Sequence, residues 1–537
     1  MKISIQAQGS RAVGNGVFNA AAISIFLISI TWIWFWAYRR KHCSIVGPKA
    51  WPLFGSALEM IHNFDHLHDW LLVYFRKTKT INIAMPSSTY TYTVDPVLVE
   101  HILKTNFSNY PKGKGFYEKM EVLLGDGIFN SDDEIWKRQR KTASFEFSSK
   151  ILRDFSTVVF RRHALRLGQI VAHSADTREP IEMQDLFSRL TLDSICKVGF
   201  GVELGVLASA LPDNPFAKAF DNANVIVTMR FFDPFWKLKR LLNVGLEASL
   251  KKSAKEIDKF IYKVIHSRRS EIQASRACGK SDQQLKPDLL SRFMELGEDP
   301  ANQINDKSLR DIVLNFIIAG RDTTAVTLSW FIYMMALHPE IADKVYEELK
   351  QLERNLESEG SLKNSTVADQ QSFNELLAKF ADRLDYETLA RLPYLHAALT
   401  ETLRLYPAVP QDVKGIVTND IAPDGTRLKG GDMVIYVPYC MGRMEFLWGK
   451  DAEQFKPERW LKDGTFQAIS PFKFTAFQAG PRICLGKDSA YLQMKMTAAL
   501  LCRFFMFELV PGHQVKYRMM TLLSMAHGIK VIVTKRT

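Results

Sequence analysis

The chain has 537 residues, of which 47% are hydrophobic, and 70 lysines and arginines against 58 aspartates and glutamates leave a net charge of +12. The length would allow about three or four domains, but no linker rich in Gly, Ser or Pro divides the main part, so we expect one large domain. The basic balance suits an acidic partner or an anionic membrane, and no nucleic-acid-binding motif accompanies it. Six scattered cysteines without pairing spacings favour a reducing compartment: Cys43, Cys196, Cys278, Cys440, Cys484 and Cys502.

An apolar run from Val17 to Tyr38 follows a polar N-terminal tail. At about 22 residues it is long enough to cross a bilayer core of ~30 Å as a helix, and longer than the ~7–15 residues of a signal-peptide core. It ends in tryptophans and a tyrosine, followed by Arg39-Arg40-Lys41. Interfacial aromatics and a basic flank predict an uncleaved membrane anchor over residues 1–41, with its C-terminal side in the cytosol.

A proline-rich stretch follows the anchor, and its prolines prevent the helix from continuing. We expect residues 42–56 to connect the anchor to the main domain over residues 57–537, either as an ordinary linker or as a stiff hinge. Thr/Tyr alternation from Ile81 to Val94 predicts a short β-hairpin, which leads through Asp95-Pro96 into a helix.

Trp136 and Arg140 are four residues apart in a predicted helix and therefore share one face. The neighbouring Lys137, Arg138 and Lys141 would face outward. A basic helix face is usually only solvated, so this spacing does not identify a site by itself.

A long apolar helix is predicted from Leu309 to Leu337, and it contains the segment Ala319-Gly320-Arg321-Asp322-Thr323-Thr324. Gly, Asp and Thr each lower helix propensity, so their presence together in a buried helix is costly. The segment indicates either a functional site or a local kink.

Glu401 and Arg404 lie three residues apart in another predicted helix, and an exposed pair of this kind would contribute only ~0.2–0.5 kcal/mol. Leu352 to Arg383 is polar and predicts a surface insertion. Near the C-terminus, Thr521 to Thr534 predicts a hairpin that turns at Gly528, with a tip that lines a pocket.

Cys484 stands between two glycines, just before a predicted helix from Lys487 to Leu501. The partial positive charge of a helix N-terminus and its free N–H groups favour a thiolate, which is the form that binds metal. Gly480 and Gly486 permit turns that let backbone amides point at the sulfur. The plain alternative is a buried structural cysteine in a glycine-rich turn, and zinc is disfavoured because no Cys/His cluster is present.

The decapeptide Phe477–Gly486 matches Phe-x-x-Gly-x-Arg-x-Cys-x-Gly at every fixed position and resembles the haem-binding loop of the cytochrome P450 family. The resemblance implies haem b as cofactor, with the Cys484 thiolate as axial ligand of the iron. Arg482 supplies a fork for a carboxylate, and the ring of Phe477 shields the metal.

The other motifs resemble this family in the same chain order. By resemblance, Trp136 and Arg140 bind a haem propionate, and Ala319 and Gly320 leave room above the iron. The Thr323 hydroxyl would hydrogen-bond dioxygen and Asp322 would relay protons from solvent. This acid–alcohol pair argues against the isomerase branch of the family. Glu401, Arg404 and Arg459 resemble a structural lock that braces the segment leading to the cysteine loop.

The resemblance implies a mainly α fold with a small β region, the cytochrome P450 fold, behind an N-terminal transmembrane helix in the endoplasmic reticulum membrane, with the catalytic domain in the cytosol. Such a monooxygenase inserts one oxygen of O2 into a C–H bond. The chain has no Gly-x-Gly-x-x-Gly fingerprint, so NADPH would act through a separate cytochrome P450 reductase, with cytochrome b5 as a further candidate partner.

Two stretches, Tyr439–Gly449 and Phe477–Arg482, look like those of plant fatty-acid ω-hydroxylases, including enzymes that supply cutin, suberin and spore or pollen wall polymers. They imply hydroxylation of a long-chain fatty acid at its terminal methyl, with Lys414 as a candidate for a polar pocket mouth or simply a solvated lysine. The cluster Phe231–Trp236 would contact substrate or membrane, or belong to the core. A sterol, terpenoid or alkane substrate stays open, as does a haem-thiolate protein that binds or senses a ligand without turnover.

Overall fold

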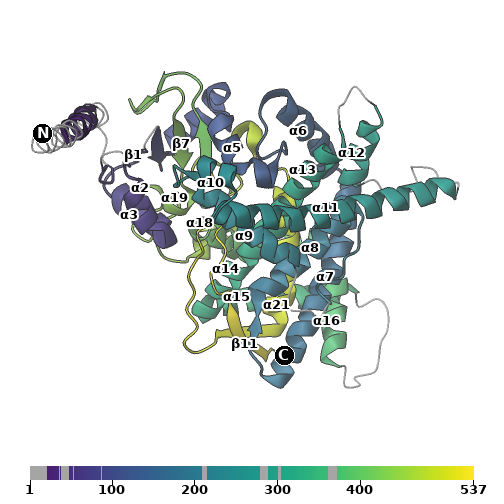
Figure 1. Ribbon diagram of the computed structural model, residues 1–537. Coiled ribbons are helices and arrows are strands. Elements are labelled where there is room, and N and C mark those ends of the chain that lie inside the picture. The colour runs from purple at the N-terminus through teal and green to yellow at the C-terminus, as the bar shows by residue number, and fades with distance from the viewer. Residues whose placement is uncertain are drawn as a thin grey trace, which may run out of the picture.

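The computed structural model of the protein describes residues 21–34, 37, 47–51, 54–85, 88–208, 215–278, 288–299, 304–360 and 372–536. Most of them are helical, with small sheets towards the edges of the molecule (Figure 1), so the predicted mainly α fold with a small β region is confirmed. The helices are α2 (Ala57–His62), α3 (Leu67–Phe75), α4 (Pro96–Glu100), α5 (Gly113–Leu124), α6 (Asp133–Phe147), α7 (Lys150–Thr177), α8 (Met183–Phe200), α9 (Pro215–Met229), α10 (Trp236–Leu242), α11 (Leu246–Ala277), α12 (Leu289–Gly297), α13 (Asp306–Ile317), α14 (Thr323–Leu337), α15 (Pro339–Gly360), α16 (Phe373–Asp382), α17 (Tyr386–Ala390), α18 (Pro393–Leu405), α19 (Pro438–Met441), α20 (Glu445–Trp448) and α21 (Lys487–Phe504).

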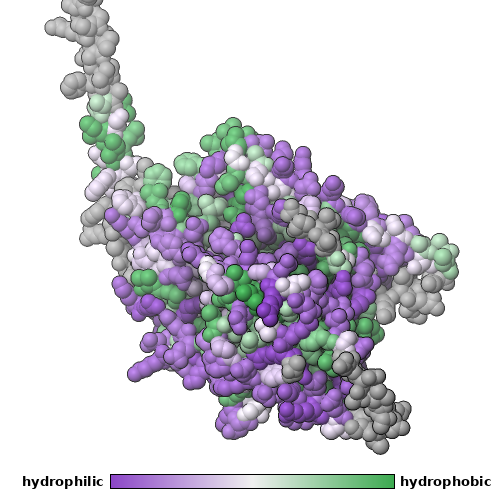
Figure 2. Space-filling model, turned by 90° about the horizontal axis from the view of Figure 1, so that it is seen from below, coloured by the Kyte–Doolittle hydropathy of each residue, from purple (hydrophilic) through white to green (hydrophobic). Residues whose placement is uncertain are grey.

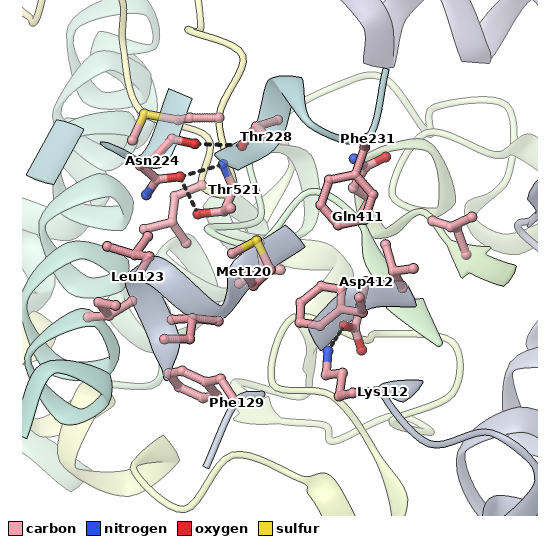
Figure 3. A pocket seen from close by; sticks show the side chains of 18 of the residues that line it. Lys112, Met120, Leu123, Phe129, Asn224, Thr228, Phe231, Gln411, Asp412 and Thr521 are labelled. Atoms are coloured by element: carbon pink, nitrogen blue, oxygen red, sulfur yellow. Dashed lines mark hydrogen bonds and ion pairs between the residues drawn. The ribbon is translucent and has the colours of Figure 1, made fainter. Parts of the chain in front are cut away.

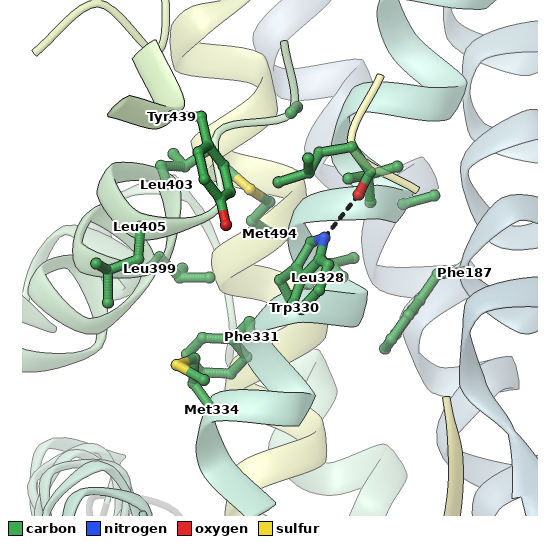
Figure 4. Packing of buried hydrophobic residues seen from close by; sticks show 14 of the residues in the cluster. Phe187, Leu328, Trp330, Phe331, Met334, Leu399, Leu403, Leu405, Tyr439 and Met494 are labelled. Atoms are coloured by element: carbon green, nitrogen blue, oxygen red, sulfur yellow. Dashed lines mark hydrogen bonds between the residues drawn. The ribbon is translucent and has the colours of Figure 1, made fainter. Parts of the chain in front are cut away.

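The central helical run confirms the long helix predicted over these residues: α13 continues through a π-helical turn, η5 (Ile318–Asp322), into α14. Because α14 is apolar on all sides, it must be surrounded by other elements, and it packs against α8, α18 and α21. Figure 4 shows this packing around Trp330, whose indole Nε1 donates to the carbonyl of Leu523 at 2.7 Å. The Trp330 ring also stacks on Tyr406 at 4.0 Å, so the central helix holds both α18 and the C-terminal loop.

The larger sheet has the strand order β1 (Thr80–Ala84), β2 (Thr89–Thr93), β7 (Met433–Tyr436), β4 (Asp412–Gly415). The antiparallel β1–β2 pair is the predicted hairpin, and Asp95 caps the helix that follows it by accepting from the backbone N–H of Val97. A second sheet has the order β10 (Phe505–Leu509), β11 (Lys530–Lys535), β3 (Ile181–Glu182). Two further strand pairs are β5 (Asp420–Ile421) with β6 (Arg427–Leu428), and β8 (Leu461–Lys462) with β9 (Thr465–Phe466).

The C-terminal segment differs from the predicted hairpin over Thr521 to Thr534. Strand β11 pairs with β10 instead, because its alternating buried valines need a partner strand whose apolar side chains share the same face. The chain between them forms a loop closed by a hydrogen bond from Arg518 N to Ser524 O at 2.7 Å. Gly528 lies outside this loop, so the predicted turn is wrong. The loop tip, residues 520–522, does line an internal cavity, as expected of the hairpin tip.

The predicted surface insertion from Leu352 to Arg383 is also wrong in part. Helix α15 continues to Gly360, and α16 buries Leu377 and Phe380 against α7 and α21. These apolar side chains are three residues apart and form one face of a helix whose other face is polar, which explains the polar composition. Residues 361–371 lie outside the described residues.

The predicted anchor, Val17 to Tyr38, lies partly outside the described residues. Residues 21–34 are helical, and Figure 2 shows this segment projecting from the body of the protein with hydrophobic side chains exposed. Within the described parts of the chain, no helix has the combined length and apolar character that crossing a bilayer requires.

Candidate functional site

The cysteine loop has the backbone geometry that its glycines suggest. Gly480 has φ +66°, and a Cβ there would lie 1.9 Å from the carbonyl oxygen of Leu103, so only glycine fits. The turn η7 (Gly480–Arg482) follows, and the N–H of Cys484 then donates to Phe477 O at 2.8 Å. The predicted helix after the loop is present as α21.

Most of the predicted site residues line one cavity, which we call the cysteine cavity. The loop contributes the Cys484 side chain, which is deep in the protein yet open to the cavity. Helix α6 contributes Trp136 and Arg140. The remaining predicted residues that line it are Ala319, Gly320, Thr323, Phe477, Arg482 and Gly486, whereas Gly480 and Asp322 do not line it.

The electrostatics around the sulfur correct one expectation. Burial raises the pKa of the Cys484 thiol, and the Gly486 N–H together with the charges of Arg140 and Lys487 offsets only part of that rise. The polypeptide alone therefore does not favour the thiolate. A bound metal ion would favour the thiolate, because a coordinating thiol loses its proton.

Two arginines of the cavity are only partly satisfied by protein groups. Arg140 Nη1 donates to the carbonyl of Ile483 at 2.5 Å. Arg482 Nη2 donates to Asp132 at 2.6 Å, its guanidinium lies 4.4 Å from the Trp136 ring centroid, and its buried Nε has no partner among the described residues. Both arginines can therefore donate hydrogen bonds to a further carboxylate.

Sequence reasoning missed a buried cluster beside these arginines. Lys112 Nζ lies 2.5 Å from Asp412 Oδ1, and Lys414 Nζ lies 2.9 Å from Asp412 Oδ2. Lys414 is fully buried, so its predicted place at a solvated mouth is wrong. It follows Asp412 by two residues on β4, and its ion pair with that carboxylate stabilises it in the interior. Burial lowers the pKa of Lys414 to about 7. A second nearby anion would restore its charge.

The charge balance tests whether haem fits this site. Lys112 and Lys414 pair with the carboxylate of Asp412, and Arg482 pairs with that of Asp132. Half-buried Arg140 adds a fourth positive charge beside Cys484. An excess of buried positive charge requires an anion. A planar group with carboxylates at one edge and a metal that takes one thiolate satisfies both this excess and Cys484, so the residues present fit haem.

The π-helical turn η5 orients the segment predicted to activate oxygen, and turns of this kind are frequent at functional sites. Thr323 faces the cysteine cavity, and its Oγ1 donates to Ala319 O at 2.6 Å. The local irregularity that the sequence also allowed is therefore present, because the π-helical turn interrupts the regular α-helix. A Cβ at Gly320 would lie 2.7 Å from the end of the Ile195 side chain, which would have to shift to admit it.

Asp322 faces away from Thr323 into a separate polar pocket, which Asp221, Arg321 and Arg518 also line. Asp322 Oδ1 lies 2.5 Å from Arg321, and its buried Oδ2 has no partner in the described chain. Burial raises the pKa of Asp322 to about 7, against the lowering effect of Arg321. An acid of this kind can both take up and release a proton near neutral pH.

Glu401, Arg404 and Arg459 come together in one buried cluster. Arg404 Nε and Nη2 each donate to Glu401 at 2.7 Å, and Arg459 Nε donates to it at 3.2 Å. Glu401 and Arg404 have no exposed side-chain surface, unlike the exposed pair considered from the sequence. Trp460 Nε1 adds a bond of 2.9 Å to the same carboxylate.

We expect Glu401→Gln to lower the free energy of unfolding by ~3–5 kcal/mol, because it leaves the Arg404 charge buried without its partner. Denaturant unfolding measures this change. The matched control is Glu100→Gln, which removes an exposed pair with Lys104 and should cost less than ~0.5 kcal/mol. Equal losses in the two variants would contradict a bracing role for Glu401.

The chain is similar to known proteins over most of its length. A family model described as Cytochrome P450 matches residues 46–533. The chain is 58% identical to cytochrome P450 704B1 of Arabidopsis thaliana over 94% of this chain and 98% of that protein. It is 48% identical to cytochrome P450 704C1 of Pinus taeda, over 90% and 92% of the two chains. For cytochrome P450 86B1 of Arabidopsis thaliana the identity is 41%, over 93% and 88%.

Proposed function

This chain belongs to the cytochrome P450 family, and from that premise we propose that it hydroxylates long-chain fatty acids at the terminal methyl group. Membership makes it a haem b monooxygenase that uses NADPH through a separate reductase. The bound haem supplies the activation of O2, of which one atom enters a C–H bond and the other leaves as water. The residues of this chain hold the haem, admit the substrate and move protons.

The residues proposed to hold haem are those of the cysteine cavity. Cys484 would supply a thiolate to the haem iron, and Phe477 lies in the same loop, which Gly480 and Gly486 shape. The excess of buried positive charge supports binding of the two haem carboxylates by Trp136, Arg140 and Arg482, with Lys112 and Lys414 as additional cations.

The observation that carries the substrate proposal is a second cavity, the apolar cavity, which adjoins the cysteine cavity. Ala319 and Thr323 line both cavities. Figure 3 shows the aliphatic and aromatic side chains that surround it, among them Met120, Leu123 and Phe231. An alkyl chain can therefore lie here with one end near Cys484, at a gain of ~0.8 kcal/mol per buried CH₂.

Terminal selectivity must come from positioning. A primary C–H bond is stronger than the secondary bonds beside it, so an unconstrained oxidant would attack the interior of the chain. The junction between the two cavities is where a chain end would be held near the iron, and fixed geometry of this kind outweighs the difference in bond strength.

Incubation of the reconstituted enzyme with reductase, NADPH and palmitic, stearic or oleic acid tests the proposal. We expect ω-hydroxy acids as the main products, identified by mass spectrometry. A sterol, a terpenoid and a long-chain alkane are assayed in parallel. Mid-chain products alone, or turnover of one of these other substrates without turnover of the acids, would overturn it.

Proton delivery is proposed to use Asp322 and Thr323. The polar pocket beside Asp322 supports a route from solvent to the helix, and Thr323 carries a hydroxyl on the cavity side of the same turn. Asp322 would take a proton from the polar pocket, and Thr323 would pass one to the reacting oxygen through water.

The proposal also includes attachment to the endoplasmic reticulum membrane through residues 1–41. A hinge over residues 42–56 would then connect this anchor to a cytosolic domain over residues 57–537. Exposed apolar side chains on and beside α10, such as Leu241 and Leu242, support contact with a membrane by the domain itself. The exposed Lys137, Arg138 and Lys141 suit an acidic reductase or cytochrome b5. Protease protection in intact microsomes tests the orientation.

A further inference from the structure

One wall of the apolar cavity is a face of the larger sheet. Side chains two residues apart on a strand share a face, and on β2 Tyr90 and Tyr92 both line the cavity. Tyr92 is paired in register with Ile435 on β7, and Ile435 with Val413 on β4; these two also line the cavity. The sheet therefore presents aliphatic side chains in its centre and two phenols towards one side.

The hydroxyls of Tyr90 and Tyr92 have no hydrogen-bond partner in the described part of the chain, although the residues are only 5% and 3% exposed. A buried tyrosine hydroxyl normally has a partner. Other buried tyrosines follow this rule: the hydroxyls of Tyr110, Tyr436 and Tyr439 donate to carboxylates at 2.6, 3.0 and 2.7 Å. The hydroxyls of Tyr90 and Tyr92 open onto the cavity that both residues line, so a ligand there can bond to them, which it could not do with phenylalanine.

The position of the two tyrosines separates them from the reacting centre. Neither lines the cysteine cavity, whereas the residues that line both cavities and mark the junction are Lys112, Phe129, Ala319, Thr323, Val409 and Gln478. A long ligand in the apolar cavity can therefore contact both the junction and the phenols. Burial raises the pKa of Tyr90 to about 12 and also raises that of Tyr92, so both remain hydrogen-bond donors in any ordinary assay buffer.

We propose that the hydroxyls of Tyr90 and Tyr92 bind the carboxylate of a long-chain acid and so determine which carbon reaches the iron. An ionised carboxylate only accepts hydrogen bonds and has two oxygens, which matches a pair of neutral donors. The charged groups in the same wall, Lys112 and Asp412, already pair with each other (Figure 3). The inference rests on the proposed function and names the residues that recognise its substrate.

The test uses the haem-loaded protein with Tyr90→Phe, Tyr92→Phe and the double substitution. Dissociation constants for palmitic acid, its methyl ester and hexadecane are measured by calorimetry, and products are assigned by mass spectrometry. We expect the double variant to lose about tenfold or more in affinity for the acid relative to the alkane. Its products should also shift from the terminal carbon towards the interior. Tyr262→Phe, a partly buried position on α11 outside both cavities, is the matched control.

The outcomes separate this inference from the proposed function. If the wild type forms ω-hydroxy acids while the double variant keeps both the affinity ratio and the product pattern, the tyrosines do not bind the carboxylate and only the inference fails. Turnover of a sterol or terpenoid, without binding of the acid by the wild type, would overturn both. An equal loss of affinity for the acid, the ester and the alkane would show that the phenols only shape the cavity wall. This result would also reject the inference.

Discussion

Cys484→Ser is expected to abolish the carbonyl absorption band typical of thiolate-ligated haem in the reduced protein. Among the cysteines of the described chain, only Cys484 lines the cysteine cavity, together with the cations that suit haem carboxylates. A serine hydroxyl does not ionise under these conditions and is a weak iron ligand, so monooxygenase activity should be lost with the band. Spectroscopy of the carbon monoxide complex measures the first effect directly.

The control for this experiment is Cys502→Ser. Cys502 is also buried, but it lies on α21 well beyond the loop and outside the cysteine cavity. This variant should keep the thiolate-type band. A band of full intensity in Cys484→Ser would disprove the assignment of the ligand.

Replacing Thr323 or Asp322 by Ala should leave haem bound and reduce product formation by a factor on the order of 10². Thr323 is the hydroxyl at the junction of the two cavities, and Asp322 is the acid on the solvent side of the same helical turn. Without them, reduced oxygen should escape as hydrogen peroxide, so the ratio of product to NADPH consumed falls. Ser329→Ala is the matched control, because its hydroxyl makes the same kind of bond to a carbonyl four residues earlier.

The pH dependence should identify Asp322 more specifically. Its pKa is raised by burial to about 7, and a proton donor must be protonated to act. Product formation limited by Asp322 should therefore be highest below pH 7 and fall as the pH rises through that value. Asp322→Asn removes the titrating group, so the descending limb should disappear. An unchanged limb, or unchanged coupling of NADPH to product, would exclude Asp322 from proton delivery.

Local patterns in the sequence predict those parts of the site that depend on neighbouring residues. The glycine positions around Cys484, the helix after it and the i, i+4 spacing of Trp136 and Arg140 are short-range features, and the structure places these side chains in one cavity. The hairpin from Ile81 to Val94 is predictable for the same reason, since alternation and a tight turn involve adjacent residues only.

Long-range packing decides the rest. Lys112 and Asp412 are 300 positions apart and meet only because β4 lies beside the start of α5. No local pattern distinguishes such a buried ion pair from two solvated charges, and this is why Lys414 was wrongly expected at a solvated mouth. The prediction of a C-terminal hairpin was wrong for a related reason. The pairing of β11 with β10 depends on which side chains must be buried and not on proximity in the chain. The sequence by itself determined the cysteine loop, the helices and the family. Only the tertiary structure decided which charges surround the loop and which tyrosines face the apolar cavity, because burial depends on every element that packs against a residue.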